Sequence, residues 1–178
     1  MFKIETKRLI IRDMTPSDES AFVAMSQDTK YQRFYDESDC DPNKYKALTG
    51  LFIAQAAEQP RTSYQLAVES KDSGQFIGTV CLRLEDNHQA SMGCAFARAA
   101  QGRKLSQEAA LALADFGFAE LGVHRIYAET ISKNLPAIKL CKSLGMRQEA
   151  HFREHRFFKQ QWWDTVVMAM LRTEWGKA

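Results

Sequence analysis

The sequence predicts one α/β domain spanning residues 1–178. Three observations lead to this. The length of 178 residues suits one hydrophobic core. The composition, 45% hydrophobic and 26% charged, is typical of a globular protein. Segments with strand character also alternate with segments of helical periodicity, without a linker rich in Pro, Gly or Ser.

The N-terminal third begins with a predicted strand over residues 4–13. Thr15 then acts as a helix cap, followed by Pro16 and by the acidic Asp18, which predicts a helix to about residue 26. A second helix is expected over residues 43–57, preceded by an aromatic and acidic segment.

The middle of the chain predicts three strands. Residues 64–69 and 75–84 are rich in β-formers and flank a polar turn ending at Gly74, which indicates an antiparallel hairpin. A third strand over residues 90–97 follows the polar turn at 85–88.

The C-terminal half predicts two more helices and three more strands. Apolar residues recur at helical spacing over 104–121, and Gly122 follows as a C-cap. A strand over 124–131, a helix over 134–144 and strands over 146–154 and 165–172 complete the series. The expected sheet thus has about seven strands, with about four helices on its faces.

Composition also narrows the possible functions. A net charge of +2 gives no electrostatic footprint for nucleic acid, so no nucleic-acid partner is expected. No apolar run is long enough to span a membrane, and nothing marks export. Four scattered cysteines without a Cys-x-x-Cys pair predict free thiols, no metal site and a cytoplasmic location.

A strand, loop and helix between residues 90 and 121 form a candidate anion site. The first amides of a helix lack intrahelical partners and attract phosphate. Gly102 lies in the loop just before the helix and allows close approach of a ligand to the backbone. In the alternative interpretation, Gly102 merely lets the loop turn.

The chain resembles the GNAT superfamily of N-acetyltransferases, in particular the branch of ribosomal-protein N-terminal alanine acetyltransferases. The resemblance extends over nearly the whole length. It rests on four segments: Thr6-Lys7-Arg8-Leu9-Ile10-Ile11-Arg12, residues 108–126, Asn134 with Ala137 and Leu144-Gly145-Met146, and Trp162-Trp163-Asp164-Thr165-Val166. The resemblance implies the GNAT fold, a mixed and strongly twisted sheet.

The resemblance further implies that acetyl-CoA lies between two splayed parallel strands, with its pyrophosphate on residues 101–106. No metal is implied. Two positions depart from the family pattern, because Ala99 replaces an Arg or Gln and Lys104 replaces a small residue. The implied cofactor-binding residues are Phe96, Gln101, Gly102, Arg103, Lys104, Leu105, Ser106 and Asn134.

Two residues are candidates for proton transfer. Cys141 occupies the position where relatives carry a Tyr or Ser that hydrogen-bonds the departing CoA sulfur; alternatively it is a silent core cysteine. A reference thiol pKa of about 8.5 would make proton donation to a similar thiolate nearly thermoneutral. Arg156 replaces the relatives' Glu, so we expect Glu154 to turn inward by strand alternation and act as the base. Otherwise Glu154 is a strand-end residue paired with an Arg.

The amine acceptor is expected to bind near an aromatic and acidic segment, unless that segment is only a solvated loop over the core. A protein N-terminus, a polyamine, an amino sugar or an amino acid would fit, and the chain could be a monomer or homodimer. A CoA-binding or protein-interaction module without turnover is the alternative. The expected acceptor residues are Tyr31, Phe34, Tyr35, Asp36, Glu37, Asp39, Asp41, Phe157, Phe158, Trp162 and Trp163.

Overall fold

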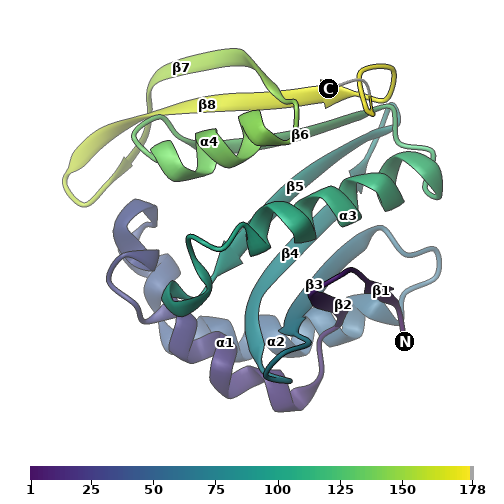
Figure 1. The fold of residues 1–178 in the computed structure, drawn as a ribbon. Helices are drawn as coiled ribbons and strands as arrows, with labels where there is room; N and C mark the ends of the chain where they lie inside the picture. The colour runs from purple at the N-terminus through teal and green to yellow at the C-terminus, as the bar shows by residue number, and fades with distance from the viewer. Residues whose placement is uncertain (177–178) are drawn as a thin grey trace.

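A computed structural model describes residues 1–176 and shows one eight-stranded sheet with helices on both faces (Figure 1). The strands are β1 (Lys3–Glu5), β2 (Leu9–Asp13), β3 (Ser63–Ser70), β4 (Phe76–Glu85), β5 (Gln89–Phe96), β6 (Arg125–Ile131), β7 (Arg147–Phe158) and β8 (Gln161–Leu171). The helices are α1 (Glu19–Ser26), α2 (Pro42–Ala56), α3 (Leu105–Ala119) and α4 (Leu135–Ser143), with short 3₁₀ turns at Pro16–Asp18, Tyr31–Phe34, Glu37–Cys40 and Arg98–Ala100.

The strand order is β1-β2-β3-β4-β5-β6-β8-β7, and every neighbouring pair is antiparallel except β5 and β6. The mixed α/β class is therefore confirmed. The sheet has one strand more than expected, because the predicted strand over residues 4–13 is a hairpin of β1 and β2. Its turn is closed by the Thr6 amide, which donates to the Leu9 carbonyl at 3.0 Å, without the Gly or Pro that would mark a turn in the sequence.

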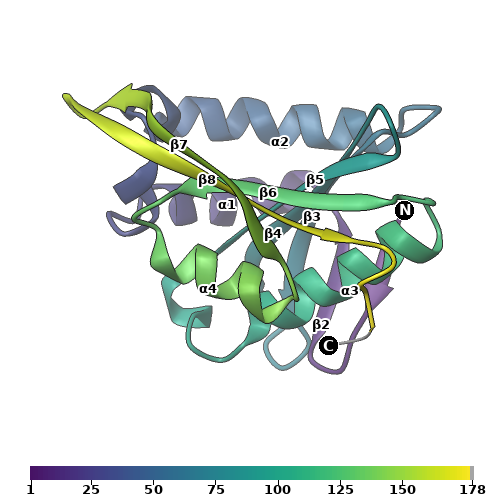
Figure 2. The ribbon, with the colours of Figure 1, turned by 90° about the horizontal axis from the view of Figure 1, so that it is seen from above.

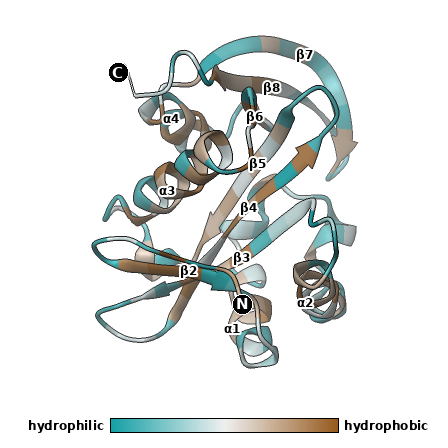
Figure 3. Ribbon diagram, turned by 90° about the vertical axis from the view of Figure 1, so that its right-hand side faces the viewer, coloured by the Kyte–Doolittle hydropathy of each residue, from teal (hydrophilic) through white to brown (hydrophobic). Residues whose placement is uncertain are grey.

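The helices divide between the two faces of the sheet, with α1 and α2 on one side and α3 and α4 on the other (Figure 2). On the α3 side, Leu66, Leu82 and Leu113 form part of the larger core. On the α1 and α2 side, Phe22 and Tyr45 pack over Ala67. Successive side chains of the central strands point to opposite faces of the sheet. Because helices cover both faces, these strands are hydrophobic along much of their length (Figure 3).

The helix starts follow local capping chemistry. The Asp18 carboxylate accepts from the Thr15 amide at 2.8 Å, as expected for the predicted capping box, although the first turn is 3₁₀ and α1 itself begins at Glu19. Asp41 caps α2 by accepting from the Asn43 amide at 2.8 Å. Among residues 1–176, no helix has the length and apolar character that crossing a membrane requires.

The β7–β8 hairpin is longer than the sequence predicts. Its turn consists of Lys159 and Gln160, both with positive φ (50° and 55°), a conformation that Gly or Asn usually provides. Neither residue type is typical of a turn. The predicted first strand of the hairpin therefore ends too early, at 154, and the predicted second strand begins too late, at 165. Next to the turn, Phe158 and Trp163 stack with ring centroids 5.1 Å apart.

Candidate active site

A cavity of about 350 Å³ opens where β5 and β6 separate. These two strands pair in parallel at only three positions, from Gln89 with Arg125 to Ser91 with Tyr127, and diverge beyond them (Figure 1). The gap exposes the edges of both strands, and α4 with the segment 31–35 closes its sides. The lining residues on the α3 and α4 side include Met92, Cys94, Ala110, Ala128, Leu140, Cys141 and Met146, and those on the α1 and α2 side include Tyr31, Tyr35, Gln65, Cys81 and Gly93.

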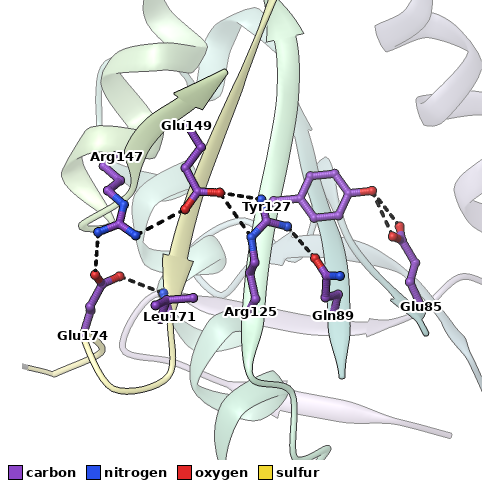
Figure 4. A network of polar contacts seen from close by, with 8 residues as sticks. All are labelled: Glu85, Gln89, Arg125, Tyr127, Arg147, Glu149, Leu171 and Glu174. Carbon is purple, nitrogen blue, oxygen red and sulfur yellow. Dashed lines mark hydrogen bonds and ion pairs between the residues drawn. The ribbon is translucent and has the colours of Figure 1, made fainter. Parts of the chain in front are cut away.

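A polar network holds the paired end of β5 and β6 together (Figure 4). The Arg125 guanidinium on β6 donates to the Gln89 side chain on β5 at 2.6 Å and to Glu149 on β7 at 2.7 Å. The Tyr127 hydroxyl donates to Glu85 on β4 at 2.9 Å. The contacts with Arg125 lower the pKa of Glu149. Four strands are therefore joined at one end of the gap, which leaves the other end free to splay.

The N-terminus of α3 faces the loop that the sequence marks as an anion site. Gly102 has φ 80° and Lys104 has φ 59°, so both lie in the left-handed region that favours glycine. Lys104 is the N-cap residue, and no side chain among residues 1–176 caps the helix. The amides of the first turn therefore lack partners within the helix. Exposed Arg103 and Lys104 add positive charge.

Contacts with the β1–β2 turn hold this loop in place. The Glu108 carboxylate in the first turn of α3 accepts from the Thr6 hydroxyl at 2.6 Å and from the Arg8 side chain at 2.7 Å. Burial opposes ionisation of Glu108, yet these bonds keep its pKa below the usual value. Arg8 also donates to the Arg103 carbonyl at 3.0 Å. The N-terminus of α3 is thus anchored to the edge of the sheet that β1 and β2 form.

The other predicted cofactor residues lie around this loop. Leu105 and the Phe96 side chain are buried in the core, and the Phe96 carbonyl accepts from the Gln101 carboxamide at 3.1 Å. Ser106 lies in the first turn of α3 and is half-buried. Phe96 and Leu105 can therefore shape the loop, whereas the amides that follow Gly102 can contact an anion.

Asn134 lies at the cavity wall and caps α4, as expected. Its Oδ1 atom accepts from the Ala137 amide at 3.4 Å, and its Nδ2 atom donates to the Thr130 hydroxyl at 3.2 Å. The cap fixes α4 beside the diverging end of β6. Asn134 therefore stands between the cavity and the smaller pocket beside it.

Cys141 lines the cavity from α4 and is 7% exposed. Burial raises the pKa of its thiol to about 11. The thiol is thus protonated at neutral pH, but transfer of its proton to a thiolate of ordinary pKa, about 8.5, would be uphill by about 3 kcal/mol. The thermoneutral transfer expected from reference values is therefore not supported. The intact thiol can still donate a hydrogen bond.

Glu154 does not face the interior, so the expectation that it turns inward is wrong. It is exposed on β7, with φ 48°, and its amide donates to the Asp164 carboxylate at 2.8 Å. A bulge between Phe152 and Arg156 breaks the alternation on which the expectation rested. Glu154 lies in an open depression outside the cavity, apart from Cys141.

Glu129 is the carboxylate that the sequence did not single out. It lies on the diverging part of β6 and lines both the main cavity and a second pocket of about 140 Å³. Among residues 1–176 it takes part in no salt bridge. It reaches the cavity because β5 and β6 diverge. In the sequence it is simply one residue of the predicted strand over 124–131.

The second pocket collects part of the predicted acceptor segment. Asp41 instead caps α2, and Glu37 accepts from the Lys159 amide at 3.3 Å. Phe157 and Trp162 are exposed, and Trp163 is buried. The lining residues of the second pocket are Phe34, Tyr35, Asp36, Asp39, Glu129, Thr130, Ile131, Asn134, Arg156, Phe158 and Thr165.

Comparison with known proteins agrees with this geometry. A family model described as the acetyltransferase (GNAT) domain matches residues 8–147. The chain therefore belongs to the GNAT family and is an N-acetyltransferase. Its relative YnaD of Bacillus subtilis (strain 168), called an uncharacterized N-acetyltransferase, is 28% identical over 174 residues, covering 97% of this chain and 99% of YnaD.

Solved structures with low sequence identity share the fold. The ribosomal-protein-S5-alanine acetyltransferase from Vibrio fischeri has a TM-score of 0.82 at 17% identity, covering 98% of this chain and 99% of that one. RimL, a ribosomal L7/L12 alpha-N-protein acetyltransferase in complex with coenzyme A, has a TM-score of 0.84 at 14% identity, covering 96% and 98%.

Proposed function

We propose that the chain transfers the acetyl group of acetyl-CoA to a primary amine by direct attack of the amine on the thioester. The observation that carries this proposal is the cavity through the sheet between β5 and β6. An uncapped helix N-terminus lies on one side of the sheet, and the Glu129 carboxylate lines the cavity on β6. One passage can therefore receive an anionic donor and a cationic acceptor from different directions.

The donor side fits a pyrophosphate and a narrow arm. The amides of residues 102–106 and the charges of Arg103 and Lys104 would bind the pyrophosphate. Apart from Gly102 and its two chain neighbours, no atom lies within 4 Å of the position a Cβ would take, so the backbone is open to close approach. Asn134 and the exposed strand edges would hold the pantetheine arm, and acetyl-CoA would supply the activated acetyl group.

The acceptor side needs a group that takes a proton, because an ammonium ion has no free electron pair. Glu129 lies where β6 diverges from β5 and has no salt bridge among the described residues. We assign it the role of general base, acting directly or through a water molecule. Asp36 in the adjoining pocket would draw a cationic amine toward it, whereas Asp39 is already paired with Lys44.

Three thiols line the cavity, and their protonation favours direct transfer over an acyl-enzyme. Burial raises the pKa of the buried thiols, that of Cys81 and that of Cys141, the latter to about 11, whereas Cys94 is exposed in the gap. A protonated thiol is a weak nucleophile. We assign Cys141 the role of donating a hydrogen bond to the departing CoA sulfur.

The proposal is tested by incubating the protein with acetyl-CoA and a panel of primary amines. Free thiol release and a mass gain of one acetyl group on the amine are the expected results. The intact protein, measured during turnover, should carry no acetyl group. CoA binding without acetylation of any amine in the panel, or an acetylated cysteine that forms during turnover, would contradict the proposal.

A further inference from the structure

The cavity continues from the gap into a compartment between the sheet and the helices α1 and α2. Its floor is a row of directly paired residues, Gln65 on β3, Cys81 on β4 and Gly93 on β5. Aromatic rings form its roof. Tyr31 and Tyr35 stack with centroids 5.0 Å apart, and the remaining roof residues are Phe22, Tyr45, Leu48 and Phe52.

Gln65 is the unexpected member of this floor. Its side chain belongs to a residue that is 7% exposed, and it lines the cavity. The carboxamide has no hydrogen-bond partner among residues 1–176. Its amide atoms are accessible from the cavity, so water or a ligand can supply hydrogen bonds that the protein does not. Gln65 is therefore positioned to bind a polar group of a ligand.

The charges around the compartment leave room for a single cation. Glu129 and Arg83 are the charged residues that line the cavity in the described part of the chain. Burial raises the pKa of Tyr31 and Tyr45, so these phenols of the roof are neutral. One ammonium ion can pair with Glu129, whereas Arg83 disfavours a second.

Strand spacing sets the reach of the ligand. Gln65 lies two strands from Gly93, which corresponds to about 9.6 Å between their backbones. An acceptor whose amine lies at the gap must therefore extend under the aromatic roof to reach the Gln65 carboxamide. A flat or apolar body of that length would also contact Tyr31 and Tyr35.

We propose that the acceptor is a monoamine with an uncharged, largely apolar body and one hydroxyl or carbonyl group at its far end, and that Gln65 selects this group. The inference rests on the proposed function and identifies its acceptor class. Gln65 is a specificity-determining residue, because it contacts the body of the acceptor and not the reacting atoms. A polyamine, with its second cation beneath the roof, is disfavoured.

The test compares tyramine with phenethylamine, which lacks the hydroxyl group, and with spermidine. In the parent protein, kcat/KM for tyramine should exceed that for phenethylamine by about 10–100-fold. In Gln65→Leu this ratio should fall to near one, because the leucine cannot bind the hydroxyl. Spermidine should be the poorest of the three. A peptide that begins with tyrosine is tested in parallel, because it carries the same phenol next to a peptide N-terminus. The comparison shows whether the acceptor is a free small amine or a peptide.

Gln55→Leu is the control, since it makes the same change at a glutamine on α2 that does not line the cavity. It should keep the parental ratio. Gln65→Met serves as a second variant if Gln65→Leu does not fold. The inference would be overturned if the Gln65 variants kept the parental ratio of kcat/KM for tyramine to that for phenethylamine. A preference of the parent protein for spermidine would also overturn it.

Binding calorimetry on the CoA-loaded protein separates the two proposals. The Kd values for tyramine and phenethylamine should differ as kcat/KM does, and this comparison requires no turnover. Selective binding of tyramine without acetylation would contradict only the proposed function. Acetylation with equal Kd values for the two amines would contradict only the role of Gln65.

Discussion

Arg125 on β6 donates to Gln89 on β5 at 2.6 Å, at the first of the three positions where these strands pair in parallel. The contact holds the paired end of the two strands, which diverge after Ser91 and Tyr127. Beyond these residues the sheet has no ladder to hold β5 to β6, and the cavity fills the space.

Replacing Arg125 with Met should loosen this clamp. The change removes the bonds to Gln89 and Glu149, and because the groups are partly exposed we expect a loss of about 1 kcal/mol in the free energy of unfolding. Urea denaturation measures it. Arg153→Met, on the exposed face of β7, is the control and should leave stability unchanged. An equal effect of both variants would argue against the clamp.

Gly102→Val should weaken CoA binding. Gly102 has φ 80°, so any side chain there strains the backbone and also projects toward the proposed phosphate site. Gly74→Val is the matched control, because Gly74 has φ 64° and equally open surroundings but lies in the β3–β4 turn. Both variants should lose about 1 kcal/mol of stability. Calorimetry should show reduced CoA affinity for Gly102→Val alone, and parental affinity in that variant would place the pyrophosphate elsewhere.

Glu129→Gln should lower kcat by about 10²–10⁴-fold near neutral pH, because the variant cannot accept the proton of the amine. Raising the pH toward the pKa of the acceptor should restore part of the rate, since the amine then arrives neutral. Glu120→Gln, just beyond α3, is the control. A pH–rate profile of Glu129→Gln that matched the parent would remove Glu129 from the mechanism.

Cys141→Ala should lower kcat while CoA affinity stays nearly parental, if the thiol supports the departing sulfur. Cys141→Ser should recover much of the rate, because a hydroxyl is the stronger donor. Steady-state kinetics at matched folded fractions gives the comparison. Should both variants lose stability and keep the parental kcat, Cys141 would be a core residue only.

Asp18 should make stability depend on pH. Burial opposes its ionisation, but bonds to Arg12 at 2.8 Å and to Thr15 lower its pKa below the usual value. A carboxylate with a lowered folded-state pKa stabilises the protein above its unfolded pKa of about 3.9, and this contribution is lost as the pH falls through the folded value.

Asp18→Asn should therefore destabilise the protein by about 2 kcal/mol at pH 7, because Arg12 then keeps only its ion pair with Glu69 and the Thr15 amide loses a charged acceptor. The difference from the parent should shrink as the pH falls below about 4. Denaturation at several pH values measures it, with Asp72→Asn in the β3–β4 turn as the control. A difference that is the same at pH 3 and pH 7 would mean that the charge of Asp18 is unimportant.

Local chemistry explains which parts of the fold could be predicted from the sequence. The cap at Asn134 and the helix start at Thr15 depend on residues within one turn of each other, and both are present. The β7–β8 turn was missed because Lys159 and Gln160 adopt positive φ without Gly or Asn. Glu154 was misplaced because a bulge interrupts the period of two.

The candidate site was less predictable, because it forms where distant segments meet. Glu129 and Gln65 look like ordinary strand residues until β5 and β6 diverge and open a cavity beside them. The resemblance to GNAT proteins placed Asn134 and Cys141 at the cavity wall, but periodicity alone could not say which carboxylate would join them. The register between β5 and β6 decides which carboxylate faces the cavity, and the sequence pattern does not reveal that register.

A crystal structure of the protein with CoA tests the central claim most directly. The account predicts that the pyrophosphate contacts the amides of residues 102–106 and that the sulfur lies in the gap between β5 and β6, beside Cys141 and on the same passage as Glu129. CoA bound elsewhere, or with its sulfur outside this gap, would contradict it.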